Sequence, residues 1–218
     1  MKKEPKNYAM IGFALLAAFA LWTFAIARLD VRPIGPRESM VGFATLNGAF
    51  HKLAGVHMTL YVITDWLGLV PFGFALAFAI LGLVQWIRRK RIWAVDYSIL
   101  VLGGFYLAVI AAYLYFESYV VNYRPVLING FLEASFPSST TLLVMTVMPT
   151  TVMQLRSRIR NSFLKKSVSA LLIAFSVFMV VGRTVCGVHW LSDIIGGALL
   201  SAGLVMMYHS IIGGKNYE

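Results

Sequence analysis

The chain has 218 residues, of which 59% are hydrophobic and 13% are charged, and its net charge is +10. Because a soluble domain carries about 25% charged residues, this composition excludes an ordinary soluble domain and indicates a protein of the bilayer. The positive residues gather in short junctions between apolar runs and do not alternate with aromatic residues, which argues against a nucleic-acid partner.

Six apolar runs are each long enough to cross about 30 Å of hydrocarbon as a helix. In chain order they are residues 9–27, 67–87, 95–116, 138–155, 168–185 and 190–212. Helices are expected because a helix satisfies every backbone polar group within its own segment in lipid. The sequence therefore predicts an all-α membrane protein with six transmembrane helices in one bundle, forming a single domain over residues 1–218.

The first run follows a basic start and has to be distinguished from a secretory signal. It lacks a small-x-small cleavage site and is long for the apolar region of a signal, so we expect it to be a retained anchor. The following segment, residues 30–66, is of mixed polarity. Within it, residues 40–61 alternate apolar and polar groups, which predicts a short amphipathic helix along the outer interface. This helix is interpreted as a packing element, and the alternative is a rim that guides lipid toward a site.

The Lys and Arg residues predict the orientation. Thirteen of the 19 lie in the junctions on the side of both termini, and six lie on the other side. Cytoplasmic loops carry the excess of positive charge, so both termini are expected in the cytoplasm and residues 30–66 outside. This bias fits a multi-pass protein of a plasma or bacterial inner membrane.

Three polar clusters then fall on the outer side. They are Tyr123-Arg124-Pro125, Pro137-Ser138-Ser139-Thr140, and Gly182-Arg183 followed by His189 and Asp193. A guanidinium stays charged and matches phosphate oxygens with a planar fork, so Arg124 and Arg183 are candidate phosphate ligands. Interfacial anchoring would explain one arginine but explains two beside a His-Asp pair less well.

His189 and Asp193 are four residues apart at the start of the sixth span, a spacing that places both on one face of a helix. A carboxylate there can accept a proton from one imidazole nitrogen and leave the other nitrogen free to attack. The alternative is a hydrogen-bonded packing histidine. Ionisable residues near hydrocarbon are costly and tend to be functional, which favours a nucleophile.

The hydroxyl cluster opens the fourth span, where Ser138, Ser139 and Thr140 follow a proline. Free amides at a helix start, together with the helix dipole, form an anion site. Taken alone this is an ordinary helix cap. Its place between the two arginine clusters favours phosphate binding.

These clusters resemble the motifs of the type-2 phosphatidic acid phosphatase superfamily, the membrane lipid phosphate phosphatases. That family shows Lys-x6-Arg-Pro, Pro-Ser-Gly-His and Ser-Arg-x5-His-x3-Asp on a six-helix core, and the resemblance covers residues 65–212. It implies that His189 is the nucleophile, that Asp193 orients it, and that Arg124 and Arg183 bind phosphate. The third motif is fairly specific, with Gly182 in place of Ser, whereas Arg-Pro and Pro-Ser are weak alone.

Two departures from the family pattern bear on the reaction. Glu117 stands where the family has Lys, and Thr140 stands where it has a second histidine, the usual general acid. Three outcomes stay open: a substrate with a good leaving group, a proton from another residue, or phosphate binding without hydrolysis. The candidate proton donors are Glu117, Glu133, His51 and His57.

The sequence thus predicts an integral membrane phosphatase that hydrolyses a phosphate ester or diphosphate of a lipid through a phosphohistidine, at the extracytoplasmic face. No cofactor is implied, and no metal, because His51 and His57 lack acidic or thiol companions at ligand spacing. The expected partners are the phosphorylated lipid and membrane lipids, without nucleic acid, and a homo-oligomer stays an open alternative. Two alternative functions stay open. One is a headgroup transferase, as in the sphingomyelin synthases, which resemble this superfamily, and the other is a non-catalytic phospholipid-binding or transport protein.

Overall fold

The computed structural model of the protein describes residues 5–214, which form helices joined by short loops, with isolated bridges and no β-strand among them. The α-helices are α1 (Pro5–Arg28), α2 (Ala44–Ala54), α3 (Met58–Leu67), α4 (Leu69–Arg89), α5 (Tyr97–Ser118), α6 (Ser139–Arg158), α7 (Ser162–Val185) and α8 (Leu191–Gly214). Two short 3-10 helices, η1 (Pro36–Glu38) and η2 (Ile92–Ala94), lie in the connections. The predicted all-α fold is confirmed.

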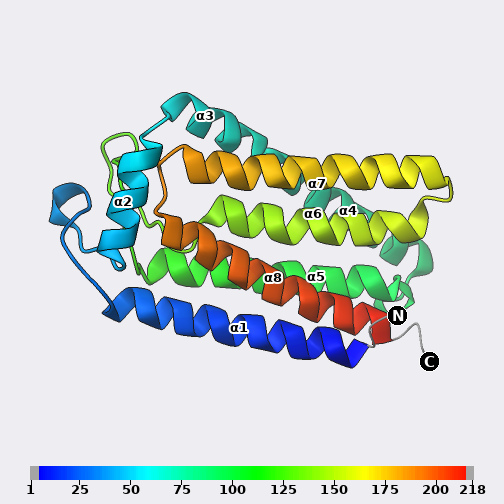
Figure 1. Cartoon of the computed structure of the whole chain (residues 1–218). Helices are drawn as coiled ribbons and strands as arrows, with labels where there is room; N and C mark the ends of the chain where they lie inside the picture. The colour runs from blue at the N-terminus through cyan, green and yellow to red at the C-terminus, as the bar shows by residue number, and fades with distance from the viewer. Residues whose placement is uncertain (1–4, 215–218) are drawn as a thin grey trace.

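The long helices α1, α4, α5, α6, α7 and α8 run side by side, and α2 lies across one end of them (Figure 1). We call this end the site end. The described chain begins and ends at the opposite end, which we call the terminal end. α1 packs along α8, and α6 packs against both α7 and α8.

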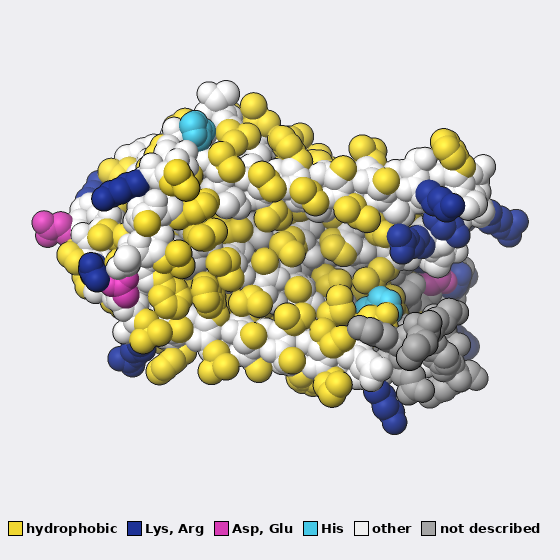
Figure 2. Space-filling view, viewed as in Figure 1, with side chains coloured by type: hydrophobic (Ala, Val, Ile, Leu, Met, Phe, Trp, Pro, Cys, Tyr) yellow, Lys and Arg dark blue, Asp and Glu magenta, His cyan; other side chains and the backbone are white. Residues whose placement is uncertain are grey.

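Five stretches of the described chain are long and apolar enough to cross a membrane. They are Lys6–Arg28, Met58–Arg89, Tyr97–Ser118, Ser162–Val185 and Leu191–Gly214. Side chains on them that would be buried in a soluble protein face outward, such as Leu21 at 70% exposure. Hydrophobic side chains also cover the middle of the face seen in Figure 2, and the basic side chains lie toward its two ends. Such a surface is stable in hydrocarbon and not in water, so the chain is a membrane protein.

α6 corresponds to the fourth predicted span but is more polar than the five apolar stretches. Its threonine hydroxyls donate to carbonyls of the preceding turn, as from Thr146 Oγ1 to Leu142 O at 2.7 Å and from Thr150 Oγ1 to Thr146 O at 2.8 Å. Both threonines are fully buried. The surrounding helices therefore shelter a helix whose own composition is not strongly apolar, and six crossings stay a prediction.

The prediction of one amphipathic helix over residues 40–61 was wrong. The structure divides this segment into α2 and α3, and α3 leads almost directly into the apolar α4. The break occurs at Gly55, whose φ of 72° is open to glycine but strained for other residues. Gly187 packs so closely here that a Cβ on it would lie 1.9 Å from Gly55 O. The His57 amide also donates to Cys186 O at 3.0 Å, so the break supports the loop that carries His189.

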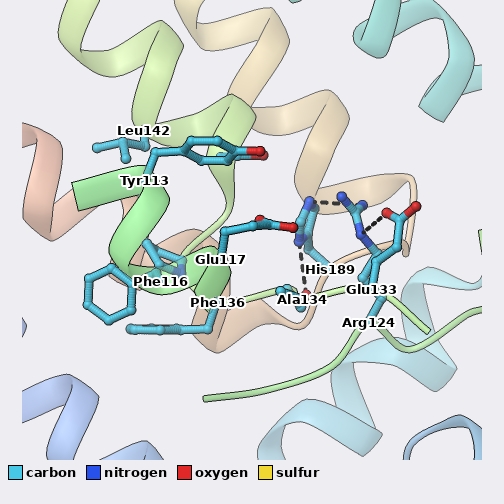
Figure 3. Close-up of a pocket in the computed structure, with 12 residues that line it drawn as sticks. Tyr113, Phe116, Glu117, Arg124, Glu133, Ala134, Phe136, Leu142 and His189 are labelled. Atoms are coloured by element: carbon cyan, nitrogen blue, oxygen red, sulfur yellow. Dashed lines mark hydrogen bonds and ion pairs between the residues drawn. The ribbon is translucent and has the colours of Figure 1, made fainter. Parts of the chain in front are cut away.

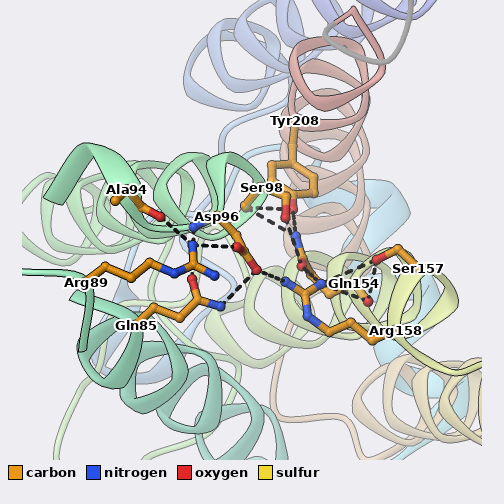
Figure 4. Close-up of polar contacts among 9 residues, drawn as sticks. All are labelled: Gln85, Arg89, Ala94, Asp96, Ser98, Gln154, Ser157, Arg158 and Tyr208. Carbon is orange, nitrogen blue, oxygen red and sulfur yellow. Dashed lines mark hydrogen bonds and ion pairs between the residues drawn. The ribbon is translucent and has the colours of Figure 1, made fainter. Parts of the chain in front are cut away.

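A polar network at the terminal end joins four helices around Asp96, which precedes α5 (Figure 4). The Asp96 carboxylate accepts from Gln85 Nε2 at 2.8 Å and pairs with Arg89 Nη1 at 3.1 Å and with Arg158 Nη2 at 3.6 Å. Arg158 also donates to Gln154, which donates to the Tyr208 hydroxyl. The network thus connects α4, α5, α6 and α8 at the end away from the candidate site.

Candidate active site

The three polar clusters of the sequence converge at the site end of the bundle. They meet at a pocket of about 270 Å³ between the end of α5, the loop before α6 and the loop before α8 (Figure 3). The polar side chains that line this pocket are Tyr113, Glu117, Arg124, Glu133, Ser135, Ser139 and His189. Segments about seventy residues apart in the chain therefore share one small volume.

The loop between α5 and α6 is held by an isolated antiparallel bridge between Tyr123 and Ala134. The Arg124 amide donates to Glu133 O at 3.0 Å, and the Ser135 amide donates to Asn122 O at 2.9 Å. Backbone pairing thus fixes Arg124 and Ser135 on facing segments. This arrangement aims both side chains at His189.

Two further bonds connect this loop and the start of α6 to the segment that carries His189 and Asp193. Trp190 Nε1 donates to Tyr123 O at 2.7 Å. The Ser138 amide donates to Asp193 O at 3.1 Å. The position of His189 therefore depends on tertiary contacts and not only on its own segment.

The His189 imidazole is contacted at both ring nitrogens. Nε2 lies 3.3 Å from Arg124 Nη1, and Nδ1 lies 3.0 Å from Ser135 Oγ. The residue is only 3% exposed. Burial lowers the pKa of His189 well below its ordinary value, and the positive charges of Arg124 and Arg183 lower it further. The ring is therefore neutral at physiological pH, as a nucleophile requires.

Asp193 lies in the first turn of α8, but His189 lies two residues before that helix begins. The prediction that both residues share one helical face was therefore wrong. Asp193 Oδ2 accepts from the Trp190 amide at 3.2 Å and from Ser135 Oγ at 2.5 Å. Among the described residues, no direct hydrogen bond joins Asp193 to His189, because the Ser135 hydroxyl lies between them.

Arg124 is oriented by an ion pair. Its Nε lies 3.1 Å from Glu133 Oε2, and the arginine side chain is 11% exposed. Figure 3 shows Arg124 between Glu133 and His189, with the Glu117 carboxylate directed at His189 from α5. The two candidate proton donors therefore differ, because Glu133 is paired with a guanidinium and Glu117 faces the ring.

Arg183 does not line this pocket but lies behind the start of α6. Its Nη2 donates to Thr140 Oγ1 at 2.6 Å and to Asp65 Oδ1 at 2.7 Å, and its guanidinium lies over the Tyr61 ring at 4.9 Å. Its Nε and Nη1 are buried and find no hydrogen-bond partner among the described residues. Because arginine donors are costly to bury unpaired, these two nitrogens are suited to an anion.

The hydroxyls at the start of α6 have three different surroundings. Ser138 is the N-cap, and its Oγ accepts from the Thr141 amide at 3.5 Å. Ser139 lines the pocket of His189 and also a neighbouring pocket of about 350 Å³, which Thr140 and Asp65 line as well. The start of the helix therefore separates the surroundings of His189 from those of Arg183.

Sequence reasoning missed Ser135, Asn122 and Asp65 as parts of this site. Ser135 belongs to no motif with a recognisable spacing. Its position two residues before Pro137, beside the hydroxyl cluster, was the only indication in the sequence. His51 and His57, which sequence reasoning named as proton donors, line neither pocket. Within the described part of the chain, no three His, Cys, Asp or Glu side chains gather to hold a metal ion.

Arginine, histidine and helix-start hydroxyls at one end of an apolar helical bundle fit the class of membrane lipid phosphatases. The profile of the PAP2 superfamily matches residues 105–217, which include all three polar clusters, and the chain belongs to this superfamily. The predicted family is therefore confirmed.

One solved structure agrees in fold over almost the whole chain. It is described as the first transmembrane PAP2 type phosphatidylglycerolphosphate phosphatase from Bacillus subtilis. The TM-score is 0.54 and the identity 20%, over 95% of this chain and 97% of that chain. At this identity the likeness shows the fold, that of a PAP2-type membrane phosphatase. No curated protein sequence matches the chain.

Proposed function

We propose that this protein hydrolyses a phosphate ester or diphosphate carried by a lipid, with His189 as the nucleophile. The observation that carries the proposal is the contact between His189 Nε2 and Arg124 Nη1 at 3.3 Å in the pocket. A nucleophilic nitrogen and a phosphate-binding guanidinium are thereby in reach of one phosphorus atom. Membership of the PAP2 superfamily supports the same chemistry.

The reaction has two steps. In the first, the Nε2 lone pair of His189 attacks phosphorus, and the bond from phosphorus to the leaving oxygen breaks, with its electron pair going to that oxygen. In the second, water attacks the phosphohistidine, and the electron pair of the phosphorus–nitrogen bond returns to Nε2. Inorganic phosphate is released, and the proton of the attacking water goes to a base.

Charge on the transferring group is stabilised by Arg124 and by the start of α6, where Ser138 caps the helix and Ser139 lines the pocket. Arg183 lies behind this helix start, bound to Thr140, and contributes its positive charge from there. Asp193 supports His189 from the side away from the pocket. No metal or organic cofactor is needed for these steps, because the arginines supply the positive charge.

Glu117 is the residue that we propose as proton donor and acceptor. It lines the pocket of His189, and its carboxylate points at the ring (Figure 3). Protonated, it gives its proton to the leaving oxygen, and it takes one from water in the second step. Glu133 is less suited because its carboxylate neutralises Arg124 at 3.1 Å.

The test is to replace His189 with alanine and measure phosphate release from lipid phosphates together with the acid-labile phosphoenzyme. We expect turnover to fall by roughly 10⁴-fold or more and the phosphoenzyme to disappear. His209→Ala is the matched control, since the ring of His209 on α8 packs at a tilt against that of Tyr8 on α1, and His209 lines neither site pocket. Retained turnover in His189→Ala would remove the nucleophile. Binding of inorganic phosphate by the wild type without any turnover would favour the non-catalytic alternative.

A headgroup transferase of the same fold is the second candidate, and the acidic Glu117 in the pocket favours it. In that reaction an alcohol of a second lipid replaces water in the second step. A headgroup-exchanged lipid formed without free phosphate would identify the transferase. Phosphate release without an acceptor lipid would identify the hydrolase.

A further inference from the structure

The Ser135 hydroxyl occupies the space between the proposed nucleophile and its carboxylate. Its Oγ lies 3.0 Å from His189 Nδ1 and 2.5 Å from Asp193 Oδ2, and the residue is 2% exposed. No water is needed to bridge the two groups, because the serine already does so. The donors and acceptors around Ser135 determine the direction of each hydrogen bond between His189 and Asp193.

The Asp193 carboxylate is filled by donors. Oδ1 accepts from Asn122 Nδ2 at 3.1 Å and from Ser192 Oγ at 3.2 Å. Oδ2 accepts from the Trp190 amide at 3.2 Å and from Ser135 Oγ at 2.5 Å. Each carboxylate oxygen has two lone pairs, so four donors satisfy the group. His189 has no remaining lone pair of Asp193 to bind.

Ser135 has only one hydroxyl proton to donate. The carboxylate of Asp193 accepts and does not donate, so that proton belongs to the bond with Asp193. Toward His189, Ser135 Oγ is therefore an acceptor, and Nδ1 carries the imidazole proton. Arg124 leads independently to the same tautomer, because a guanidinium only donates and its Nη1 faces Nε2 at 3.3 Å.

We infer that Ser135 is a positioning residue that holds His189 as the Nδ1–H tautomer and transmits the charge of Asp193 to it. This inference deepens the proposed function and rests on it. The lone pair of Nε2 then faces the pocket, where an incoming phosphate oxygen takes over the Arg124 donor. After attack, the phosphorylated ring is positively charged and keeps its proton on Nδ1, where Ser135 and the Asp193 carboxylate stabilise it.

The surroundings hold Ser135 in this place. Its amide donates to Asn122 O at 2.9 Å, and Asn122 Oδ1 accepts from the Gly42 amide at 3.1 Å, which fixes the orientation of the Asn122 amide group. Asn47 Nδ2 donates to Ser192 Oγ at 2.9 Å, so the Ser192 proton is directed to Asp193. The segment before α2 and the helix itself therefore support the bridge without touching the pocket.

The direct test is the tautomer of His189 in the full-length protein in detergent, by nitrogen-15 NMR of labelled histidine. A His189→Gln sample identifies the signal. We expect a protonated Nδ1 and an unprotonated Nε2 in the wild type. Because Arg124 by itself favours this tautomer, the shift toward the Nε2–H tautomer is expected when Ser135→Ala is combined with Arg124→Leu. Ser201→Ala is the matched control, because Ser201 is a fully buried serine that donates to Gly197 O within α8.

Kinetics provide the second readout. We expect kcat of Ser135→Ala to fall by about 10- to 100-fold with little change in KM, as for other residues that orient a reacting group. Ser135→Thr retains the hydroxyl and should retain most of kcat, and in the Arg124→Leu background it should keep the Nδ1–H tautomer. A wild-type ring protonated on Nε2, or a tautomer that Ser135→Ala leaves unchanged in the Arg124→Leu background, would overturn the inference. The NMR result needs no turnover, so its failure is distinct from failure of the proposed function.

Discussion

Thr140 stands where the family pattern has its second histidine, and the structure gives its hydroxyl another role. Thr140 Oγ1 accepts from Arg183 Nη2 at 2.6 Å and so helps to hold a buried guanidinium. A threonine hydroxyl is far too weak an acid to protonate a leaving alkoxide. Loss of a general acid typically costs about 10²- to 10⁴-fold in rate, unless another group supplies the proton.

The leaving group should therefore decide which lipid phosphate is cleaved fastest. Attack on the terminal phosphorus of a lipid diphosphate expels a lipid monophosphate, which needs little protonation, whereas attack on phosphatidic acid expels an alkoxide. We expect the purified protein to cleave a polyprenyl diphosphate about 10²-fold faster than phosphatidic acid, measured as kcat/KM. Glu117→Gln should widen this ratio, because it removes the proposed donor that phosphatidic acid needs more. Equal rates on the two lipids would contradict the prediction.

The pH dependence of activity should reflect the environment of His189. Burial first, and then the charges of Arg124 and Arg183, lower its pKa well below the ordinary value of 6.5. Only the neutral ring attacks, so kcat/KM should persist as the pH falls through about 6.5 and decline only at lower pH. In Arg124→Gln the remaining activity should decline at higher pH than in the wild type, since one positive charge is gone. Ionisation of the substrate affects both pH profiles equally. If the decline at low pH occurs at the same pH in the wild type and in Arg124→Gln, the charge of Arg124 does not lower the pKa of His189.

At the scale of elements, the starts of α6 and α8 and the loops before them position the site. The terminal-end network holds the opposite ends of these two helices together. Asp96 is central to this network, between α4 and the ends of α6 and α8. The hydrogen bond from Gln85, followed by those of Arg89 and the charge of Arg158, lowers the pKa of Asp96. A carboxylate with a lowered pKa stabilises the fold above its unfolded-state pKa and loses this effect as the pH falls.

Asp96→Asn should therefore destabilise the bundle at neutral pH. We expect a loss of about 1 kcal/mol, since the carboxylate is 40% exposed and solvent screens its ion pairs. Thermal unfolding in detergent should show a lower Tm, and the difference from the wild type should narrow below pH of about 4. Glu38→Gln is the control, because Glu38 is exposed and has no ion pair among the described residues. A Tm difference between Asp96→Asn and the wild type that stays constant with pH would show that the charge of Asp96 is not what stabilises the bundle.

At the scale of the whole molecule, the charge distribution suggests how the bundle lies in the membrane. The basic junctions around residues 88–91 and 156–166 lie at the terminal end, opposite the pocket (Figure 1). Lys2, Lys3 and Lys215, which belong to the same predicted side, lie outside the described residues. The positive-inside tendency then favours a cytoplasmic terminal end and an extracytoplasmic pocket.

Labelling of single cysteines in intact cells tests this orientation. Phe131 is 71% exposed in the loop that bears the pocket, and Trp93 is 89% exposed at the terminal end. A membrane-impermeant thiol reagent should label Phe131→Cys in intact cells and Trp93→Cys only after permeabilisation. The native Cys186 is fully buried, so the unsubstituted protein serves as the background control. Labelling in the reverse pattern would invert the proposed topology.

The positions of the long helices were predictable from the sequence, because hydropathy is a sum over one continuous stretch of residues. The predicted run at 95–116 and α5 (Tyr97–Ser118) differ by two residues at each end, and the other long helices overlap their predicted runs. Hydropathy suffices for this because lipid requires each span to satisfy its own backbone. The break at Gly55 was not predictable in the same way, because it depends on the close approach of Gly187.

The sequence by itself determined that this is a helical membrane protein of the PAP2 superfamily, with its polar residues collected near Arg124, Ser138 and His189. Only the tertiary structure decided that Ser135 stands between His189 and Asp193, and that Thr140 pairs with Arg183. The physical reason is the distance along the chain between the groups that interact. Hydrophobicity and motif spacing are local in the chain, whereas a hydrogen bond between groups 54 or 58 residues apart depends on how loops and helix starts pack together.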